Sequence, residues 1–174
     1  MSGDERKALY INAYNAMAIG IVLGSPPVRS IRDVRGAFDG IRRKIGGEPL
    51  TLDDVENRLR EMKDARIHFA IVCASRSCPP LAGKAFKAAG LSAALDAQAR
   101  AFVSDPSKNV LDRARTRLAL FKIFDWNRKE FERDAGTLPA YVARFFGEPS
   151  LASWVATFPK APEFLEYDWA LNQP

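Results

Sequence analysis

The feature that most constrains the fold is a short apolar segment near the middle of the chain. Ile67 to Ala74 is an almost uninterrupted run of apolar residues, interrupted only by His68. A strand with one face in water alternates apolar and polar residues, whereas a continuous run is typical of a strand covered on both faces. We therefore predict a buried central strand at about residues 67–74, packed by several helices.

A long helix is expected at the amino-terminal end. The pattern from Asp4 to Leu23 is helical, and Gly24 followed by two prolines predicts its end. Apolar residues fall on nearly every face of this segment, which predicts a helix buried on most sides.

The rest of the chain predicts short helices and strands in irregular order. Gly46 and Gly47 predict the turn of a hairpin, and Thr51 predicts the N-cap of the helix that follows it. The expected elements are the hairpin at 41–50, helices at 52–62, 91–103, 126–134, 138–146 and 151–158, strands within 110–121 and a terminal strand near 164–171. Because helices and strands do not alternate regularly, the predicted class is α+β, with a small mixed or antiparallel sheet around the buried strand.

The length and net charge of the chain limit the number of domains and the classes of partner to expect. The 174 residues match one ordinary domain, and no linker, repeat or low-complexity tract divides them, so a single domain over residues 1–174 is expected. A net charge of +5 is too weak to indicate a polyanionic partner. Arg113, Arg115 and Arg117 alternate as on a solvated strand face, so no nucleic-acid partner is expected, and a small molecule or a peptide is the more fitting ligand.

The chain as written carries no sign of membrane insertion or export. No apolar run reaches the roughly 18 residues that a membrane span needs. The start lacks the order of basic, apolar and small residues that marks a secretory signal. The expectation is a cytoplasmic chain without a transmembrane segment. Since Met1 to Lys7 leads almost directly into the first helix, a longer parent could have lost its beginning.

Two residues of the central run and one residue after it are candidates for catalysis. His68 is the only histidine, and therefore the one side chain naturally suited to proton transfer near neutral pH. On a strand, His68 and Cys73 would point to opposite faces, which disfavours a direct pair. Cys78 is freer, and a helix starting at Pro79 would place it at a helix N-terminus, which favours a thiolate. Both cysteines could equally be small buried residues, or form a disulfide in an oxidising compartment.

Candidate substrate-binding or orienting side chains lie on both sides of this run. Asn12, Tyr14 and Asn15 belong to the first helix, where two buried amides require hydrogen-bond partners. These amides either tie down neighbouring loops or line a pocket. Ser75 and Arg76 lie between the cysteines and complete the set.

Glu56 is the candidate carboxylate. It stands four residues before Arg60, which is the spacing of an ordinary helical ion pair. One histidine and two cysteines separated by four residues do not form a metal-binding pattern, so neither a metal nor another cofactor is expected.

Several of these segments resemble the DUF547 family, a family of domains of unknown function. The segments are Asn12-Ala13-Tyr14-Asn15, Leu52-Asp53-Asp54-Val55-Glu56, the long block from Arg66 to Leu81, and Lys122-Ile123-Phe124-Asp125-Trp126. The resemblance extends from about residue 7 to 147. Bacterial members often carry a secretion or lipoprotein signal, which implies a periplasmic or cell-envelope address for a longer parent. Some eukaryotic members are fused to glutaredoxin-like and DEP domains, which hints at thiol chemistry.

The chain departs from the family pattern at two positions. Asn57 stands where the family has a histidine after the glutamate, which puts in doubt any activity that uses this histidine. Tyr10 replaces a more usual indole or phenyl ring.

Two functions from different classes remain open. The first is a binding or scaffold domain with a polar His/Cys/Asn core. The second is a thiol-dependent hydrolase or transferase, remotely like papain or transglutaminase, with a cysteine nucleophile and His68 as base.

Overall fold

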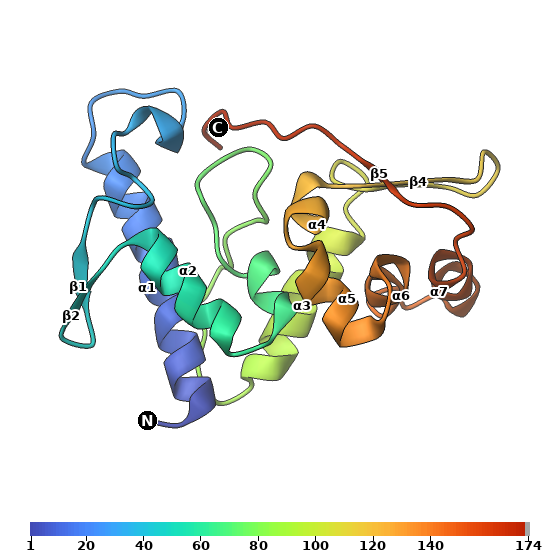
Figure 1. Ribbon diagram of the computed structural model, residues 1–174, viewed down its shortest axis with the longest axis horizontal. Helices are drawn as coiled ribbons and strands as arrows, with labels where there is room; N and C mark the ends of the chain where they lie inside the picture. The colour runs from blue at the N-terminus through green and yellow to red at the C-terminus, as the bar shows by residue number, and fades with distance from the viewer. Residues whose placement is uncertain (173–174) are drawn as a thin grey trace. The chain divides into compact units, whose positions relative to one another are not determined.

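The computed structural model describes residues 1–172 and forms two compact units (Figure 1). The first contains Met1–Leu95 together with the chain from Asp168 onward, and the second contains Asp96–Tyr167. Within the described residues there are seven α-helices, a two-stranded sheet and a three-stranded sheet, which confirms the α+β class. None of the helices in residues 1–172 is both long and apolar enough to cross a membrane.

Helix α1 (Gly3–Leu23) opens the first unit. Ser2 and Glu5 form a capping box at its start, with Glu5 N–H donating to Ser2 Oγ at 3.2 Å and Ser2 N–H donating to the Glu5 carboxylate at 2.6 Å. One side of the helix packs in the core through residues such as Ile11 and Ala18. The expectation of burial on most sides is too broad, because the opposite side reaches solvent and Leu23 is 79% exposed.

The hairpin and the second helix form as their local signals predict. Strands β1 (Arg43–Ile45) and β2 (Glu48–Leu50) pair antiparallel. The turn between them needs positive φ at Gly46 and Gly47, at 62° and 92°, which glycine adopts without steric cost. Helix α2 (Leu52–Glu61) follows with Thr51 as its N-cap, and packs its Val55 and Leu59 stripe in the core with α1.

The predicted central strand at 67–74 is wrong, although its burial is confirmed. Residues Ala65–Phe69 form a 3₁₀ helix, and the chain then continues without regular structure. Ala70 and Ile71 both donate to the carbonyl of Ile67, at 2.9 and 3.0 Å. The apolar run is therefore buried as a compact turn, because its backbone groups bond locally and to side chains instead of to neighbouring strands.

Helix α3 (Leu91–Val103) runs from the first unit into the second without a break. In the second unit β3 (Val110–Asp112) pairs antiparallel with β4 (Arg117–Leu120), which also pairs in parallel with β5 (Glu163–Phe164). The remaining helices are α4 (Lys122–Trp126), α5 (Arg128–Ala135), α6 (Leu138–Ala143) and α7 (Pro149–Ala156). The expected strand at 164–171 is wrong beyond Phe164, except for a single bridge between Leu171 and Ser75.

Aromatic rings fill the core of the second unit. Phe102, Phe124, Phe131, Tyr141 and Phe145 make successive contacts, with ring centroids 4.8–6.0 Å apart. Such tilted and edge-on contacts are the favourable arrangements for aromatic pairs.

Candidate functional site

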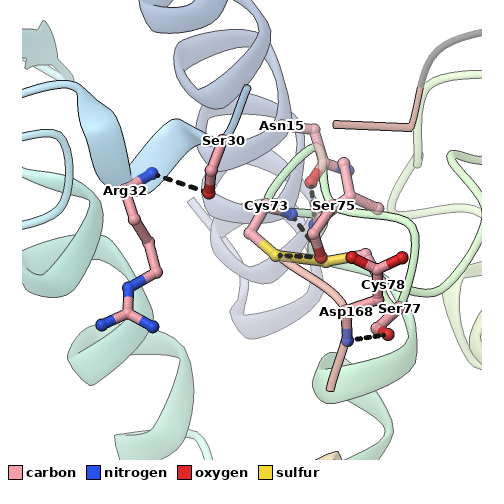
Figure 2. Close-up of a disulfide and its surroundings, with 9 residues drawn as sticks. Asn15, Ser30, Arg32, Cys73, Ser75, Ser77, Cys78 and Asp168 are labelled. Atoms are coloured by element: carbon pink, nitrogen blue, oxygen red, sulfur yellow. Dashed lines mark hydrogen bonds between the residues drawn. A yellow bond between two sulfur atoms is a disulfide. The ribbon is translucent and has the colours of Figure 1, made fainter. Parts of the chain in front are cut away.

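The segment that carries the two cysteines is a small closed loop. Cys73 and Cys78 form a disulfide with their Cα atoms 6.3 Å apart (Figure 2). Within the loop, Cys78 N–H donates to Ser75 O at 3.1 Å, and Cys73 N–H donates to Cys78 Sγ at 2.9 Å. Ala74 has a φ of 58°, in the left-handed region that non-glycine residues seldom adopt. The disulfide thus holds a tight turn that the sequence alone does not favour.

Asn15 fixes the backbone just before this loop. Its Nδ2 donates to Ala70 O at 2.9 Å, and its Oδ1 accepts from Val72 N–H at 2.8 Å. Asn12 makes the same double contact with Phe86, donating to its carbonyl at 2.8 Å and accepting from its N–H at 2.9 Å. Of the two roles considered for these amides, tying down loops is therefore the one the contacts match.

The remaining candidate residues lie on the 3₁₀ helix, α1 and α2. His68 is 4% exposed in the 3₁₀ helix, and Tyr14 is 3% exposed on α1. Glu56 accepts from Arg60 Nη2 at 2.9 Å, as its helical spacing predicts. No helix starts at Pro79, so the expected placement of Cys78 at a helix N-terminus is wrong.

A segment near the end of the chain covers the disulfide loop. Residues 168–172, here called the strap, pair with the loop through the backbone: Arg76 N–H donates to Ala170 O at 2.8 Å, and Asn172 N–H donates to Ala74 O at 2.8 Å. Asp168 N–H also donates to Ser77 Oγ at 2.7 Å (Figure 2). Ser75 and Ser77 are buried, whereas the side chain of Arg76 is exposed and its Nη1 lies 3.8 Å from Asp168 Oδ2.

The strap also contributes one wall of a pocket in the first unit. The pocket has a volume of about 360 Å³. Phe38 and Trp169 form an edge-to-face corner with ring centroids 6.4 Å apart, and the Arg32 guanidinium lies 5.0 Å from the Trp169 ring. Asp39 and Asp53 line the same pocket. We call it the Trp169 pocket.

The carboxyl of Asp53 has a pKa above its usual value. Partial burial raises this pKa most, the carboxylates of Glu56, Asp39 and Asp54 add to the effect, and the Arg60 guanidinium opposes it. Within residues 1–172, neither Asp39 nor Asp53 forms an ion pair. The pocket therefore holds two carboxylates without an ion pair beside an aromatic corner, together with one cation, the Arg32 guanidinium.

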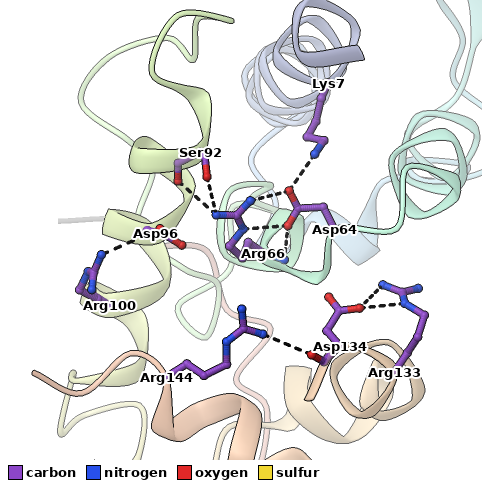
Figure 3. A network of polar contacts seen from close by, with 9 residues as sticks. All are labelled: Lys7, Asp64, Arg66, Ser92, Asp96, Arg100, Arg133, Asp134 and Arg144. Carbon is purple, nitrogen blue, oxygen red and sulfur yellow. Dashed lines mark hydrogen bonds and ion pairs between the residues drawn. The ribbon is translucent and has the colours of Figure 1, made fainter. Parts of the chain in front are cut away.

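A partly buried ion cluster stabilises the start of the 3₁₀ helix (Figure 3). Asp64 accepts from Lys7 Nζ at 2.7 Å and binds Arg66 through both oxygens at 2.9 Å. Burial by itself would raise the pKa of Asp64, but the hydrogen bonds from Arg66 and Lys7 outweigh it and lower this pKa to about 2. Arg66 Nη1 also donates to Ser92 Oγ at 3.0 Å, which connects α1, the 3₁₀ helix and the start of α3.

Sequence reasoning did not find the strap or the Trp169 pocket. Asp168 and Ser77 are separated by 91 positions, and no local pattern marks either as a partner of the other. In the described part of the chain, no three His, Cys, Asp or Glu side chains are grouped so that they could hold a metal ion.

The comparisons with known proteins identify the family of the chain through a match that ends before Lys122–Trp126. No curated protein and no solved structure matches the chain at a significant level. The family model described as "Protein of unknown function, DUF547" matches residues 1–103, which include α1, α2 and the whole disulfide loop. This match covers more than half of the 174 residues, and the chain therefore belongs to the DUF547 family.

Proposed function

We propose that this chain is a binding domain in which the polar His/Cys/Asn residues stabilise the fold, and in which the Trp169 pocket receives a ligand. The observation that carries the first part is the double hydrogen bond of Asn15 to Ala70 and Val72. With both ends of this amide engaged by backbone, and both sulfurs joined to each other, these groups act in the folded state as structural ties.

The chemistry of the pocket favours a small organic cation with an apolar part. Phe38 and Trp169 offer aromatic faces and edges, and cations bind aromatic faces through the ring quadrupole. Asp39 and Asp53 supply two carboxylates against the single cation of the lining, Arg32, which leaves an excess of one negative charge among the lining residues. A ligand of this kind would relieve the repulsion between the carboxylates and bury apolar surface at the same time.

The ligand part is tested with choline and its uncharged carbon isostere, 3,3-dimethyl-1-butanol, by isothermal titration calorimetry on the full chain. We expect choline to bind and the isostere to bind at least about fivefold more weakly, since a cation–π contact contributes about 1 kcal/mol or more. Asp53→Asn should weaken choline binding, while Glu166→Gln, at an exposed acid outside the pocket, should not. Equal behaviour of the two compounds, or no effect of Asp53→Asn, would contradict the proposal.

The structural part is tested by thermal melting. His68→Ala and Cys73→Ala should each lower the melting temperature, because both residues are nearly buried, with 4% and 9% exposure. A variant that keeps its melting temperature but loses a measurable activity would contradict a structural role.

One contact supports a second candidate, the thiol-dependent hydrolase or transferase. Cys73 N–H donates to Cys78 Sγ at 2.9 Å, and a donor at this position would favour a Cys78 thiolate once a reductant has opened the disulfide. In this candidate Cys78 is the nucleophile and His68 the base. Reduced protein should then react with iodoacetamide at pH 6–7 faster at one cysteine than a free thiol does. Slow labelling of both cysteines in the folded, reduced chain would eliminate it.

A further inference from the structure

The strap is hydrogen-bonded to the disulfide loop through its backbone. Three backbone donors connect them: Arg76 N–H and Asn172 N–H at 2.8 Å from their acceptors, and Ser77 N–H at 3.3 Å from Asp168 O. Ser75 and Leu171 form an antiparallel bridge at the centre of this pairing. The strap is therefore bound to the loop as an added strand is bound to a sheet edge.

The shape of the loop depends on the disulfide. Ala74 keeps a left-handed φ of 58°, which is unfavourable for a residue with a side chain. Inside the loop, Cys78 N–H donates to Ser75 O, and the contacts from Cys73 N–H to Cys78 Sγ and between Cys73 Sγ and Ser75 Oγ both use a sulfur of the disulfide. Once the disulfide is opened, the chain between the cysteines regains conformational freedom, and the strained turn has less to hold it.

The chain before the loop has independent support. Asn15 binds Ala70 and Val72, and the Asp64 cluster anchors the 3₁₀ helix. The core between α1 and α2 contains neither cysteine. A change at the disulfide should consequently stay local to the loop and the strap.

The strap also contacts other parts of the first unit. Leu171 N–H donates to Arg29 O at 2.8 Å, and Trp169 touches Phe38 and Arg32 in the Trp169 pocket. The two cysteines of the loop to which the strap is bonded are nearly buried, with 9% and 7% exposure. Loop and strap thus stabilise each other.

We propose that the Cys73–Cys78 disulfide is a redox switch whose reduction releases the strap and removes the Trp169 wall of the pocket. In the reaction two thiol groups of a reductant are oxidised to one disulfide, while the Cys73–Cys78 bond takes up two electrons and two protons to give two thiols. The release itself follows from the geometry of loop and strap. Its effect on ligand binding rests on the function proposed for the pocket.

The test is hydrogen–deuterium exchange of the full chain, oxidised and reduced, with a 2 Da mass gain confirming reduction of the disulfide. Exchange in residues 74–77 and 168–172 should become at least about tenfold faster on reduction, while α2 keeps its protection. The double variant Cys73→Ser/Cys78→Ser should show the fast exchange without any reductant. Unchanged exchange in fully reduced protein would refute the switch, and so would loss of protection throughout the first unit, because the disulfide would then hold the whole fold.

A reciprocal measurement examines the shielding of the sulfurs. Trp169→Ala weakens the attachment of the strap, so dithiothreitol should reduce the disulfide at least about threefold faster than in the native chain. Trp154→Ala, which lies on α7 of the second unit, serves as the matched control and should leave the rate unchanged. An equal rate in the native chain and in Trp169→Ala would count against the coupling of strap and disulfide.

These outcomes are separable from those of the ligand experiment. If the strap is released on reduction but choline binds neither form, the switch stands and the proposed ligand is wrong. If choline binds both forms equally while exchange responds to reduction, the control of binding by the switch is wrong.

Discussion

At the scale of single residues, amide side chains supply the backbone hydrogen bonds that neighbouring strands supply in a sheet. Asn15 and Asn12 each offer one donor and one acceptor to a passing backbone. Asn109 does the same in the second unit, donating to Phe102 O at 2.8 Å and accepting from Phe121 N–H at 3.1 Å. Irregular segments can be buried here because these amides satisfy their polar groups.

Replacing Asn15 tests this role directly. Asn15→Ala leaves Ala70 O and Val72 N–H without their described partner in a buried setting, so we expect a loss of about 2–4 kcal/mol in the free energy of unfolding. Urea denaturation measures this change. Asn57→Ala, at an exposed position of α2, is the matched control and should change stability by less than about 0.5 kcal/mol. A small effect of Asn15→Ala would mean that water or a rearranged backbone replaces the amide.

Asp64 makes stability depend on pH in the acid range. Its folded-state pKa of about 2 lies below the unperturbed value of 3.8 because Arg66 and Lys7 hold the carboxylate, whose side chain is 11% exposed. Because the pKa is lower in the folded than in the unfolded state, the ionised carboxylate stabilises the folded chain by about 2 kcal/mol when the pH is above the unfolded-state pKa. This stabilisation is lost as the pH falls from about 4 to about 2. We expect the free energy of unfolding, measured by urea denaturation between pH 6 and 2, to fall by about 2 kcal/mol less in Asp64→Asn than in the native chain. Glu166→Gln should follow the native chain, and parallel curves for native and Asp64→Asn would disprove the linkage.

At the scale of elements, those with their own local signals were predicted well. Helices α1 and α2 and the hairpin form where cap residues and glycines favour them, since these signals act within four residues of each other. The run at 67–74 was predicted as a strand and is a 3₁₀ helix followed by an irregular chain. The apolar content of a segment predicts that the segment is buried, but it does not predict which groups form hydrogen bonds with its backbone.

Thr51 offers a test at this scale. Thr51 Oγ1 accepts from Asp54 N–H at 3.1 Å, and the Asp54 carboxylate accepts from Thr51 N–H at 3.0 Å; these bonds also lower the pKa of Asp54. Thr51→Ala should lower the free energy of unfolding by about 1 kcal/mol, as determined in urea. Ser153→Ala, within α7, tests whether loss of any hydroxyl has the same effect. An equal loss in both variants would contradict a specific role of the cap.

At the scale of the whole molecule, the two compact units share helix α3. The prediction of a single domain stays a prediction, and calorimetry can test it. Since α3 runs through both units without a linker, we expect one transition in which the calorimetric and van't Hoff enthalpies agree. Two resolved transitions, or a van't Hoff enthalpy well below the calorimetric one, would show that the units unfold separately.

The sequence by itself determined the α+β class, the boundaries of the capped elements and the segment where the candidate residues lie. The tertiary structure decided how residues 65–78 fold, that Cys73 and Cys78 pair, and that the strap lies on their loop. The reason is the separation of the partners: Asn15 and Val72 are 57 positions apart, Asn12 and Phe86 are 74 apart, and Ser77 and Asp168 are 91 apart. Contacts between residues so far apart in the sequence depend on how the whole chain packs, so the local sequence around either residue does not predict them.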